Sequence, residues 1–409
     1  MLYLQSATKR TQWAVLGMLS AVMLAYLAAA AGFVATLSAG FLAIFLLLWL
    51  FAWAGISDRR VLLTLVLATV LVVLSVGVPS DGWDARSIWL FHGKRIFMDA
   101  SLYSQLDGYA GWSQNDYPSF VPMMMAGLAR LAGGWNELLP KVSGTLLLLP
   151  ALLVIALGFR QTSLLALFFV PLLMLGGVHL INGYMDALVA VYATASVVAV
   201  SGIVASGRQT LFQYSVVYAL LTAVLVLLKN EALVVAAAVF AAASLASVVR
   251  QRKLPMAMLS AFLLGLIPLA LWKWSVSSHN VVNDLAASNF EAQLRDRLPN
   301  VFYSVFILED LLLRLWVLLP LLVLVLMRGS LRMTSVQVAL LASSAYCAVL
   351  YVVYLSTPHD VRWHLQTSSS RTVMPLAMMI VYAALASIDS LVSKLPALNV
   401  NERIQDDVR

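Results

Sequence analysis

The long apolar runs of this chain constrain its fold more than any other feature. A helix needs about 20 apolar residues to cross the hydrocarbon core of a bilayer. Hydrophobic residues make up 62% of the sequence and charged residues only 11%, whereas soluble domains carry about 25% charged residues. No soluble fold has enough interior to hide so many apolar side chains. The sequence therefore predicts an all-α fold, a polytopic transmembrane helical bundle that forms a single transmembrane domain over residues 1–409.

Runs of sufficient length predict about twelve membrane-spanning helices. The segment 118–132 is apolar but short and contains Arg130, so we expect it to form a helix that dips into the outer leaflet. If it crosses instead, the spans number about thirteen and every later span is inverted. The approximate ranges of the spans are 13–31, 34–55, 61–78, 138–159, 163–181, 185–206, 211–228, 231–249, 256–275, 306–327, 336–356 and 372–392.

The basic residues indicate the orientation, since short cytoplasmic loops carry an excess of Lys and Arg. The net charge of +7 is thus explained by topology and does not indicate nucleic acid as a partner. The single Cys347 excludes a disulfide framework within the chain. With both termini in the cytoplasm, nearly every inner loop holds a cation: Arg59, Arg60, Arg160, Arg208, Arg250, Arg252, Lys253, Arg328 and Arg332.

The same orientation leaves two large outer loops, 79–135 with interfacial helices and 276–305, and a short cytoplasmic tail at 394–409. All five histidines and most of the acids then lie on the outer side or at the outer ends of spans. Topology explains the inner Arg and Lys but not this outer mixture of acids, His, Trp and Tyr. The mixture indicates chemistry at the outer face, because loops held by a rigid scaffold commonly carry function.

Asp84 begins the polar part of the first outer loop. At about 100° per residue, a helix over 84–98 would place Asp84, Ile88, Phe91 and Arg95 on one face. One interpretation of Asp84 is a carboxylate that caps the helix and favours its N-terminus. The other is a general base that deprotonates an acceptor hydroxyl, a task that suits a carboxylate held near that hydroxyl.

Asp116 and Tyr117 form a second polar group in this loop, just before Pro118. Asp116 is interpreted either as a cap of the following helix or as a residue that positions substrate hydroxyls or a metal. Asp186 lies one turn inside a span, where an ionisable residue is costly and is a functional candidate by default. The remaining alternative for Asp186 is an ion pair with a neighbouring helix.

Two further polar segments fall on the outer side. Lys229 and Glu231 lie in a tight turn between two spans. One interpretation is a local salt bridge, and the other is a site in which Lys229 meets an anionic headgroup and Glu231 orients Lys229. The segment 357–375 carries His364, three Ser and Arg371 before the last span. Arg with Ser hydroxyls suits a phosphate or pyrophosphate; the alternative is an interfacial Arg that snorkels.

A metal site is only weakly indicated. His359, Asp360 and His364 lack a strong ligand spacing, so we predict no metal site in that segment. A divalent cation shared by Asp84 and another outer acid stays open, because hard cations take carboxylate oxygens as ligands.

Together these segments resemble the GT-C superfamily of integral-membrane glycosyltransferases, in its bacterial branch that depends on polyprenyl-phosphate sugars. The likeness covers most of the chain as architecture, and the order and common side of the short motifs give the signal. It is carried by GWDARSIW around Asp84, NDYPSFVP, NGYMDAL, LKNEAL, and HDVRWHLQTSSSR before the last span.

The resemblance implies a glycosyltransferase of a bacterial inner (plasma) membrane, with a periplasmic active site and a role in building cell-envelope glycans. Asp84 would be the catalytic base, and Arg371 or Lys94 would hold the phosphate of a polyprenyl-phosphate sugar donor. The acceptor would be a lipid-linked glycan or another hydroxyl, with membrane lipids around the enzyme, and a single displacement would invert the anomeric carbon. Further substrate contacts would come from Asp116, Tyr117, Asp186, Lys229, Glu231 and His364.

Two features depart from the better-known members of that superfamily. Two spans precede the span that leads into the motif loop, and no soluble domain follows the last span, which favours a small or lipid-linked acceptor. Trp83, Trp89, Trp112 and Trp363 suit stacking on sugar faces, although aromatic residues at a membrane interface need no such role.

Other function classes remain open. A transporter or flippase of lipid-linked or small solutes places ionisable groups near the midplane on broken helices, often in repeated halves, whereas here the charges gather at outer span ends. An O-antigen ligase-like enzyme carries a large late loop with His and Arg, which 357–371 partly resembles. A non-catalytic, lipid-binding subunit of an assembly is a further alternative.

Overall fold

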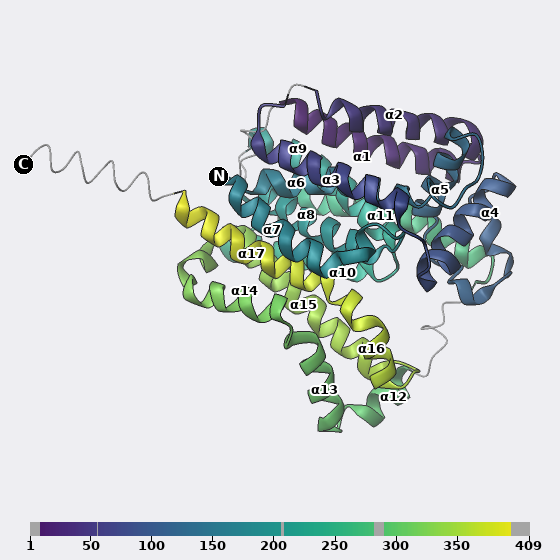
Figure 1. Ribbon diagram of the computed structural model, residues 1–409. Coiled ribbons are helices and arrows are strands. Elements are labelled where there is room, and N and C mark those ends of the chain that lie inside the picture. The colour runs from purple at the N-terminus through teal and green to yellow at the C-terminus, as the bar shows by residue number, and fades with distance from the viewer. Residues whose placement is uncertain (1–8, 55, 206–207, 282–289, 394–409) are drawn as a thin grey trace, which may run out of the picture.

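The computed structural model describes residues 9–54, 56–205, 208–281 and 290–393, and in this part of the chain every regular element is helical (Figure 1). The expected tail at 394–409 lies outside the described residues. The α-helices are α1 (Lys9–Ala30), α2 (Ala39–Phe51), α3 (Arg59–Gly77), α4 (Phe91–Asp99), α5 (Phe120–Leu131), α6 (Val142–Gly158), α7 (Thr162–Gly176), α8 (Asp186–Ala205), α9 (Arg208–Leu228), α10 (Ala232–Gln251), α11 (Met256–Ser278), α12 (Phe290–Arg297), α13 (Val301–Leu312), α14 (Leu315–Leu326), α15 (Thr334–Ser356), α16 (Val361–Thr372) and α17 (Met374–Val392).

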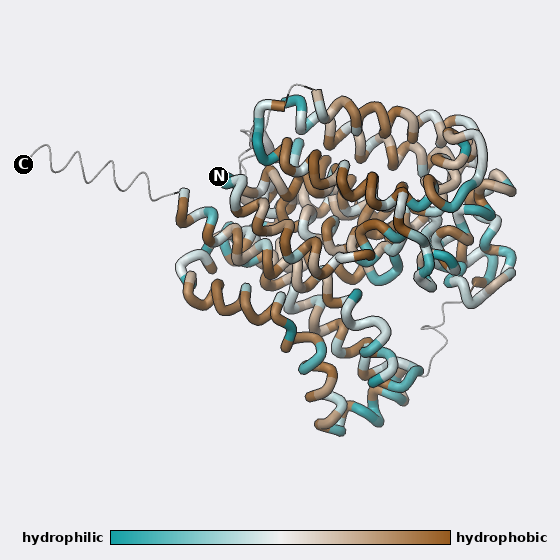
Figure 2. Tube along the Cα trace, viewed as in Figure 1, coloured by the Kyte–Doolittle hydropathy of each residue, from teal (hydrophilic) through white to brown (hydrophobic). Residues whose placement is uncertain are grey.

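The predicted multi-pass bundle is confirmed. Among the described residues, ten helices are long and apolar enough to cross a membrane, and they correspond to ten of the twelve predicted spans. The predicted span at 138–159 is the 17-residue α6. The predicted span at 306–327 is divided into α13 and α14, with a break at Leu313 and Arg314. Figure 2 shows hydrophobic residues along the helices and hydrophilic residues gathered towards their ends.

The two ends of the bundle differ in what they carry. One end, called here the loop end, holds the segment 79–135 and the C-terminus of α1, since the Tyr103 hydroxyl donates to the Ala30 carbonyl. The other, called the basic end, holds Arg60, which donates to the Phe159 carbonyl beyond α6. At the basic end Asp389 of α17 also accepts from the backbone N–H groups before α7.

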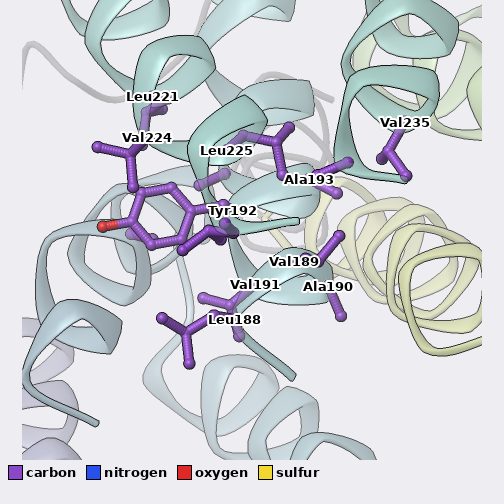
Figure 3. Close-up of a cluster of buried hydrophobic side chains, with 14 of the residues drawn as sticks. Leu188, Val189, Ala190, Val191, Tyr192, Ala193, Leu221, Val224, Leu225 and Val235 are labelled. Atoms are coloured by element: carbon purple, nitrogen blue, oxygen red, sulfur yellow. The ribbon is translucent and has the colours of Figure 1, made fainter. Parts of the chain in front are cut away.

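α8 is the centre of the bundle. It packs against α6, α9, α10, α15 and α17, and its membrane-crossing window is completely buried. Figure 3 shows Leu188 and Tyr192 of α8 among Leu221 and Leu225 of α9 and Val235 of α10. The many Ala, Gly and Ser residues of α8 let the surrounding helices approach closely, as small residues do in membrane bundles. Its first residue, Asp186, is therefore fixed by packing on several sides.

The segment 118–132 neither crosses the bundle nor lies on its surface. It forms α5, whose 12 residues extend about 18 Å at 1.5 Å per residue, too short for a 30 Å hydrocarbon core. Most of its side chains are buried, because α5 packs on α2, α4 and α6. The segment is thus a short, buried helix that anchors the first loop to the bundle, and its depth in the outer leaflet stays a prediction.

The close packing of α9 on α11 predicts a sensitive glycine. A Cβ atom at Gly265 would lie 2.7 Å from Thr222 Cβ and 2.8 Å from the Ala219 carbonyl oxygen. Gly265→Val should therefore push the two helices apart and cost about 1–3 kcal/mol, as overpacking generally does. The measurement is the thermal unfolding midpoint in detergent, with Gly40→Ala as control because its Cβ would meet nothing within 4 Å. Equal midpoints for the two variants would contradict this packing.

Candidate functional site

The first loop turns Asp84 towards the C-terminal part of the chain. Trp83 and Asp84 are helical, and a π-helical turn, Ala85–Leu90, leads into α4. The side chain of Asp84 makes no capping hydrogen bond, so its interpretation as a helix cap is wrong. Its Oδ2 instead accepts from Nη1 of Arg371 at 2.5 Å. This contact joins two segments that are 287 residues apart.

Arg371 lies in the last turn of α16. Its guanidinium lies 3.7 Å from Oδ2 of Asp186 and over the ring of Tyr184, 5.4 Å from the centroid. The Arg371 side chain is 19% exposed and that of Asp84 15%, which is too buried for a snorkelling residue. Arg371 has the carboxylate partners that its position required.

Lys229 continues the chain of charges. Its Nζ lies 3.1 Å from Oδ1 of Asp186 and 3.5 Å from Oε1 of Glu231. The hydroxyl of Tyr117 donates to the same Oε1 at 3.2 Å. Asp186 thus does pair with a neighbouring helix, but it pairs with two cations at once. We call the five charged residues Asp84, Arg371, Asp186, Lys229 and Glu231 the charged cluster.

The cluster holds its cations in the charged form. Burial alone would lower the pKa of Lys229, but the carboxylates of Asp186 and Glu231 outweigh this and raise that pKa well above its usual value. Burial likewise opposes the charge on Arg371, and Asp186 and Asp84 raise its pKa in the same way. Opposite charges within a few ångströms favour the ionised form. The cluster therefore holds two positive charges among three carboxylates, and an anion that enters must displace a carboxylate from one of them.

A small pocket of about 20 Å³ lies beside these charges, which is room for about one water molecule. Two of its carboxylate oxygens, Oδ2 of Asp186 and Oε2 of Glu231, are buried and accept no hydrogen bond from the described residues. A buried acceptor without a donor is costly, so a water molecule or a ligand hydroxyl would relieve it. The pocket is lined by Asp186, Val189, Lys229, Glu231, Tyr346, Arg371, Thr372 and Pro375.

Asp116 lies beside the charged cluster, in a second polar group. Its Oδ2 accepts from Nδ2 of Asn230 at 2.6 Å and lies 3.3 Å from Nζ of Lys273. Its carbonyl accepts from Nε1 of Trp272 at 3.0 Å. Asn230 separates Lys229 from Glu231, so Asp116 holds the turn that presents both residues to the pocket. α5 begins four residues later, at Phe120.

Two predicted residues lie elsewhere. Lys94 is exposed on α4 and lines a different surface hollow, so the structure does not bring it to the charged cluster. His364 lies on α16 but outside the charged cluster. Its Nδ1 is 2.8 Å from the Thr357 hydroxyl, and its ring packs on Tyr354. Burial lowers the pKa of His364 to about 4, so this imidazole is neutral at pH 7.

The sequence interpretation missed Lys273, Tyr184 and Tyr346. Lys273 was detectable, because it is an ionisable residue inside a predicted span, which is a functional candidate by default. Tyr184 and Tyr346 carry no such signal. Their roles follow from proximity: Tyr184 lies against Arg371 and Tyr346 lines the pocket.

The described residues contain no group of three or more His, Cys, Asp and Glu arranged to hold a metal ion. The carboxylates of the charged cluster are already engaged by Arg371 and Lys229. A divalent cation shared by Asp84 and another outer acid stays a prediction.

Comparison of the chain with models of protein families, with curated proteins and with solved structures found no match.

A buried imidazole holds the inner side of the first loop. His92 of α4 is completely buried, and its Nε2 lies 3.0 Å from the Ser113 hydroxyl and 3.3 Å from Oδ1 of Asn115. Burial lowers the pKa of His92 to about 4, although the hydrogen bond to Asn115 acts in the opposite direction. Asn115 precedes Asp116, so the neutral imidazole supports the loop next to the charged cluster.

The depressed pKa of His92 predicts a loop that loosens in acid. An unfolded histidine titrates near 6.5, so between about pH 6.5 and 4 the unfolded loop binds more protons than the folded one. Stability of 79–135 is then fully present above pH 6.5 and is lost as the pH falls towards 4. Hydrogen–deuterium exchange, corrected for the intrinsic pH dependence, measures this. His92→Gln should flatten the profile, and an unchanged profile would show that His92 is not the group responsible.

Proposed function

We propose that this protein is a membrane glycosyltransferase of the GT-C type, which moves a sugar from a polyprenyl-phosphate donor to an acceptor hydroxyl. The observation that carries the proposal is the ion pair of Asp84 with Arg371 beside the pocket. It supplies a carboxylate suited to a general base and a cation suited to a phosphate at one place. The loop end would face the periplasm of a bacterial inner membrane, with both termini in the cytoplasm, as the distribution of basic residues favours.

The proposed reaction is a single displacement. The acceptor oxygen attacks the anomeric carbon of the donor while the bond from that carbon to the phosphate oxygen breaks. The electron pair leaves with the polyprenyl phosphate, and Asp84 takes the proton of the acceptor hydroxyl. Arg371 and Lys229 stabilise the negative charge that develops on the leaving phosphate, and such fixed charges need no reorganisation during the reaction. The configuration at the anomeric carbon is inverted.

The ion pair of Asp84 with Arg371 also sets the order of events. While the two side chains are bound at 2.5 Å, the guanidinium occupies the carboxylate oxygen Oδ2 of Asp84. A donor phosphate competes for Arg371, because guanidinium binds phosphate with a matching fork of donors. Binding of the donor therefore releases Asp84 for the acceptor. Proton abstraction is coupled to the presence of the donor.

An apolar groove supports a donor with a lipid chain. It has a volume of about 440 Å³ and lies between α13, α14, α15 and α17. Cys347 and Leu376 line this groove, while their neighbours Tyr346 and Pro375 line the charged pocket. The groove and the pocket thus lie on two sides of the same two helices. A lipid-linked phosphate is the kind of ligand that needs an apolar and a cationic surface so close together.

The geometry disfavours the transporter interpretation. Transporters commonly hold their ionisable groups near the membrane midplane on interrupted helices. Here Asp186 begins α8, Lys229 follows the end of α9, and Arg371 ends α16, so the charged cluster lies at the loop end. α13 and α14 are interrupted, but Arg314 at their break contacts Ser369 and Asp310 and not the charged pocket.

Asp84→Asn should lower turnover by about 10²-fold or more, the usual contribution of a general base. The same change should leave donor binding intact or tighten it, since Arg371 loses its competing carboxylate. The measurement is sugar transfer by the purified protein from a panel of polyprenyl-phosphate hexoses, with donor affinity measured separately. A purely structural role of Asp84 would instead lower turnover and binding together.

The matched control is Glu291→Gln. In the described part of the chain Glu291 pairs with Arg295 on the exposed α12, so its loss should leave turnover within about twofold, as expected for an exposed ion pair. Full turnover by Asp84→Asn would remove the base assignment. Uptake of a solute by the wild-type protein without sugar transfer would replace the proposal with the transporter.

A further inference from the structure

Exposed aromatic rings continue outward from Asp84 over the surface of the first loop. Trp83, the residue before Asp84, is 64% exposed and lies 5.7 Å from the ring of Trp112, which is 57% exposed. Trp112 contacts Phe91, and Phe91 stacks on Tyr109, which is 66% exposed. We call these four residues, Trp83, Trp112, Phe91 and Tyr109, the aromatic platform. Trp89 is buried and takes no part in it, contrary to the sequence expectation.

Arg95 and Asp107 hold part of the platform in place. Arg95 makes two hydrogen bonds to the carboxylate of Asp107, at 3.0 and 2.5 Å, and its guanidinium lies over the rings of Tyr109 and Phe91 at 5.5 and 5.9 Å from the centroids. Asp107 also accepts from the backbone N–H of Tyr109. The rings therefore lose little conformational entropy when a ligand binds, which favours binding.

The hollow next to these rings is electrically balanced. It has a volume of about 480 Å³, and its lining combines the charged Lys94, Arg95, Asp99 and Asp107 with the largely apolar Phe91, Met98 and Tyr109. Two positive and two negative side chains give this lining no net charge. An anionic membrane surface would be bound through an excess of Lys and Arg, which the balanced lining of the hollow does not have.

We propose that the aromatic platform binds a neutral carbohydrate chain, and that this chain is the acceptor of the proposed transferase. The flat, amphipathic rings of Trp and Tyr suit the apolar faces of sugar rings. The charged groups of the hollow donate to and accept from sugar hydroxyls. The path ends at Trp83, next to the carboxylate that would deprotonate the terminal hydroxyl. The identity of the chain as acceptor rests on the proposed function, whereas carbohydrate binding itself does not.

Binding is tested without any donor. The probes are neutral tetrasaccharides of glucose, mannose and N-acetylglucosamine, titrated against the full-length protein in nanodiscs while tryptophan fluorescence is followed. Wild-type protein should bind at least one of them saturably, and Trp112→Ala should bind at least tenfold more weakly. Trp112→Phe should restore most of the affinity, because a ring is retained. Trp274→Ala is the matched control, since Trp274 is 78% exposed on the spanning helix α11.

A second measurement distinguishes sugar from membrane. In nanodiscs of brominated phosphatidylcholine, the lipid should quench the fluorescence of Trp274 but not that of Trp112. The fluorescence of each tryptophan is the emission that its replacement by alanine removes. Quenching of Trp112 together with no saturable binding of any tetrasaccharide would overturn the proposal and make the platform a membrane anchor. Equal affinities of the Trp112→Ala and Trp274→Ala variants would also overturn it. Neither result depends on Asp84, so a failure here is distinct from a failure of the proposed transferase.

Discussion

Opposite charges in an apolar bundle hold this structure's site together. Asp84, Arg371, Asp186 and Lys229 come from four separate parts of the chain, and each has an oppositely charged partner within 3.7 Å. Removing one partner of a buried pair costs about 3–5 kcal/mol, because the remaining charge is left without compensation. The first loop, α8, the turn after α9 and α16 must therefore meet at one point. The packing of the other helices around α8 is consistent with that requirement.

The same pairs make the site responsive to a ligand. Each positive charge is neutralised by carboxylates in the absence of ligand, and a buried phosphate is favourable only if it takes over one of these partnerships. Asp84 is the partner that is most easily exchanged, since Asp186 is fixed by the packing of α8 and also binds Lys229. In the proposed function, a phosphate would thus displace the carboxylate nearest the loop. In the proposed reaction this displacement frees the general base when the donor arrives.

The sequence predicted the helical bundle because apolar length is a direct physical requirement for crossing a membrane. It also indicated Asp84, Asp186, Lys229 and Arg371, since ionisable residues at span ends need partners. It did not show that Lys229 would lie in the charged cluster and Lys94 would not. That difference depends on the π-helical turn Ala85–Leu90, across which the period of 100° per residue does not hold.

Tertiary packing decided other points that no local pattern contains. Asp84 and Arg95 were expected on one helical face, yet Asp84 pairs with Arg371 whereas Arg95 pairs with Asp107. Trp83 and Trp89 are both tryptophans in the same segment, yet one is exposed and the other buried. The segment 118–132 has the composition of an interfacial helix but is enclosed by α2, α4 and α6. Burial of this kind is set by the neighbours that a segment meets, and those are distant in sequence.

The three surfaces lie in environments of different polarity, and each suits a different part of the proposed substrates. The apolar groove lies along spanning helices, the charged pocket lies where those helices end, and the aromatic platform lies on the loop beyond them. A lipid chain is apolar, a phosphate is charged and a neutral sugar chain is polar, so the three match the groove, the pocket and the platform in that order. Each would meet the surface whose desolvation costs it least. A site built at the bundle midplane would force the polar acceptor into the bilayer, whereas a site on a soluble domain would force the lipid out of it. The end of the bundle is the location at which neither cost arises.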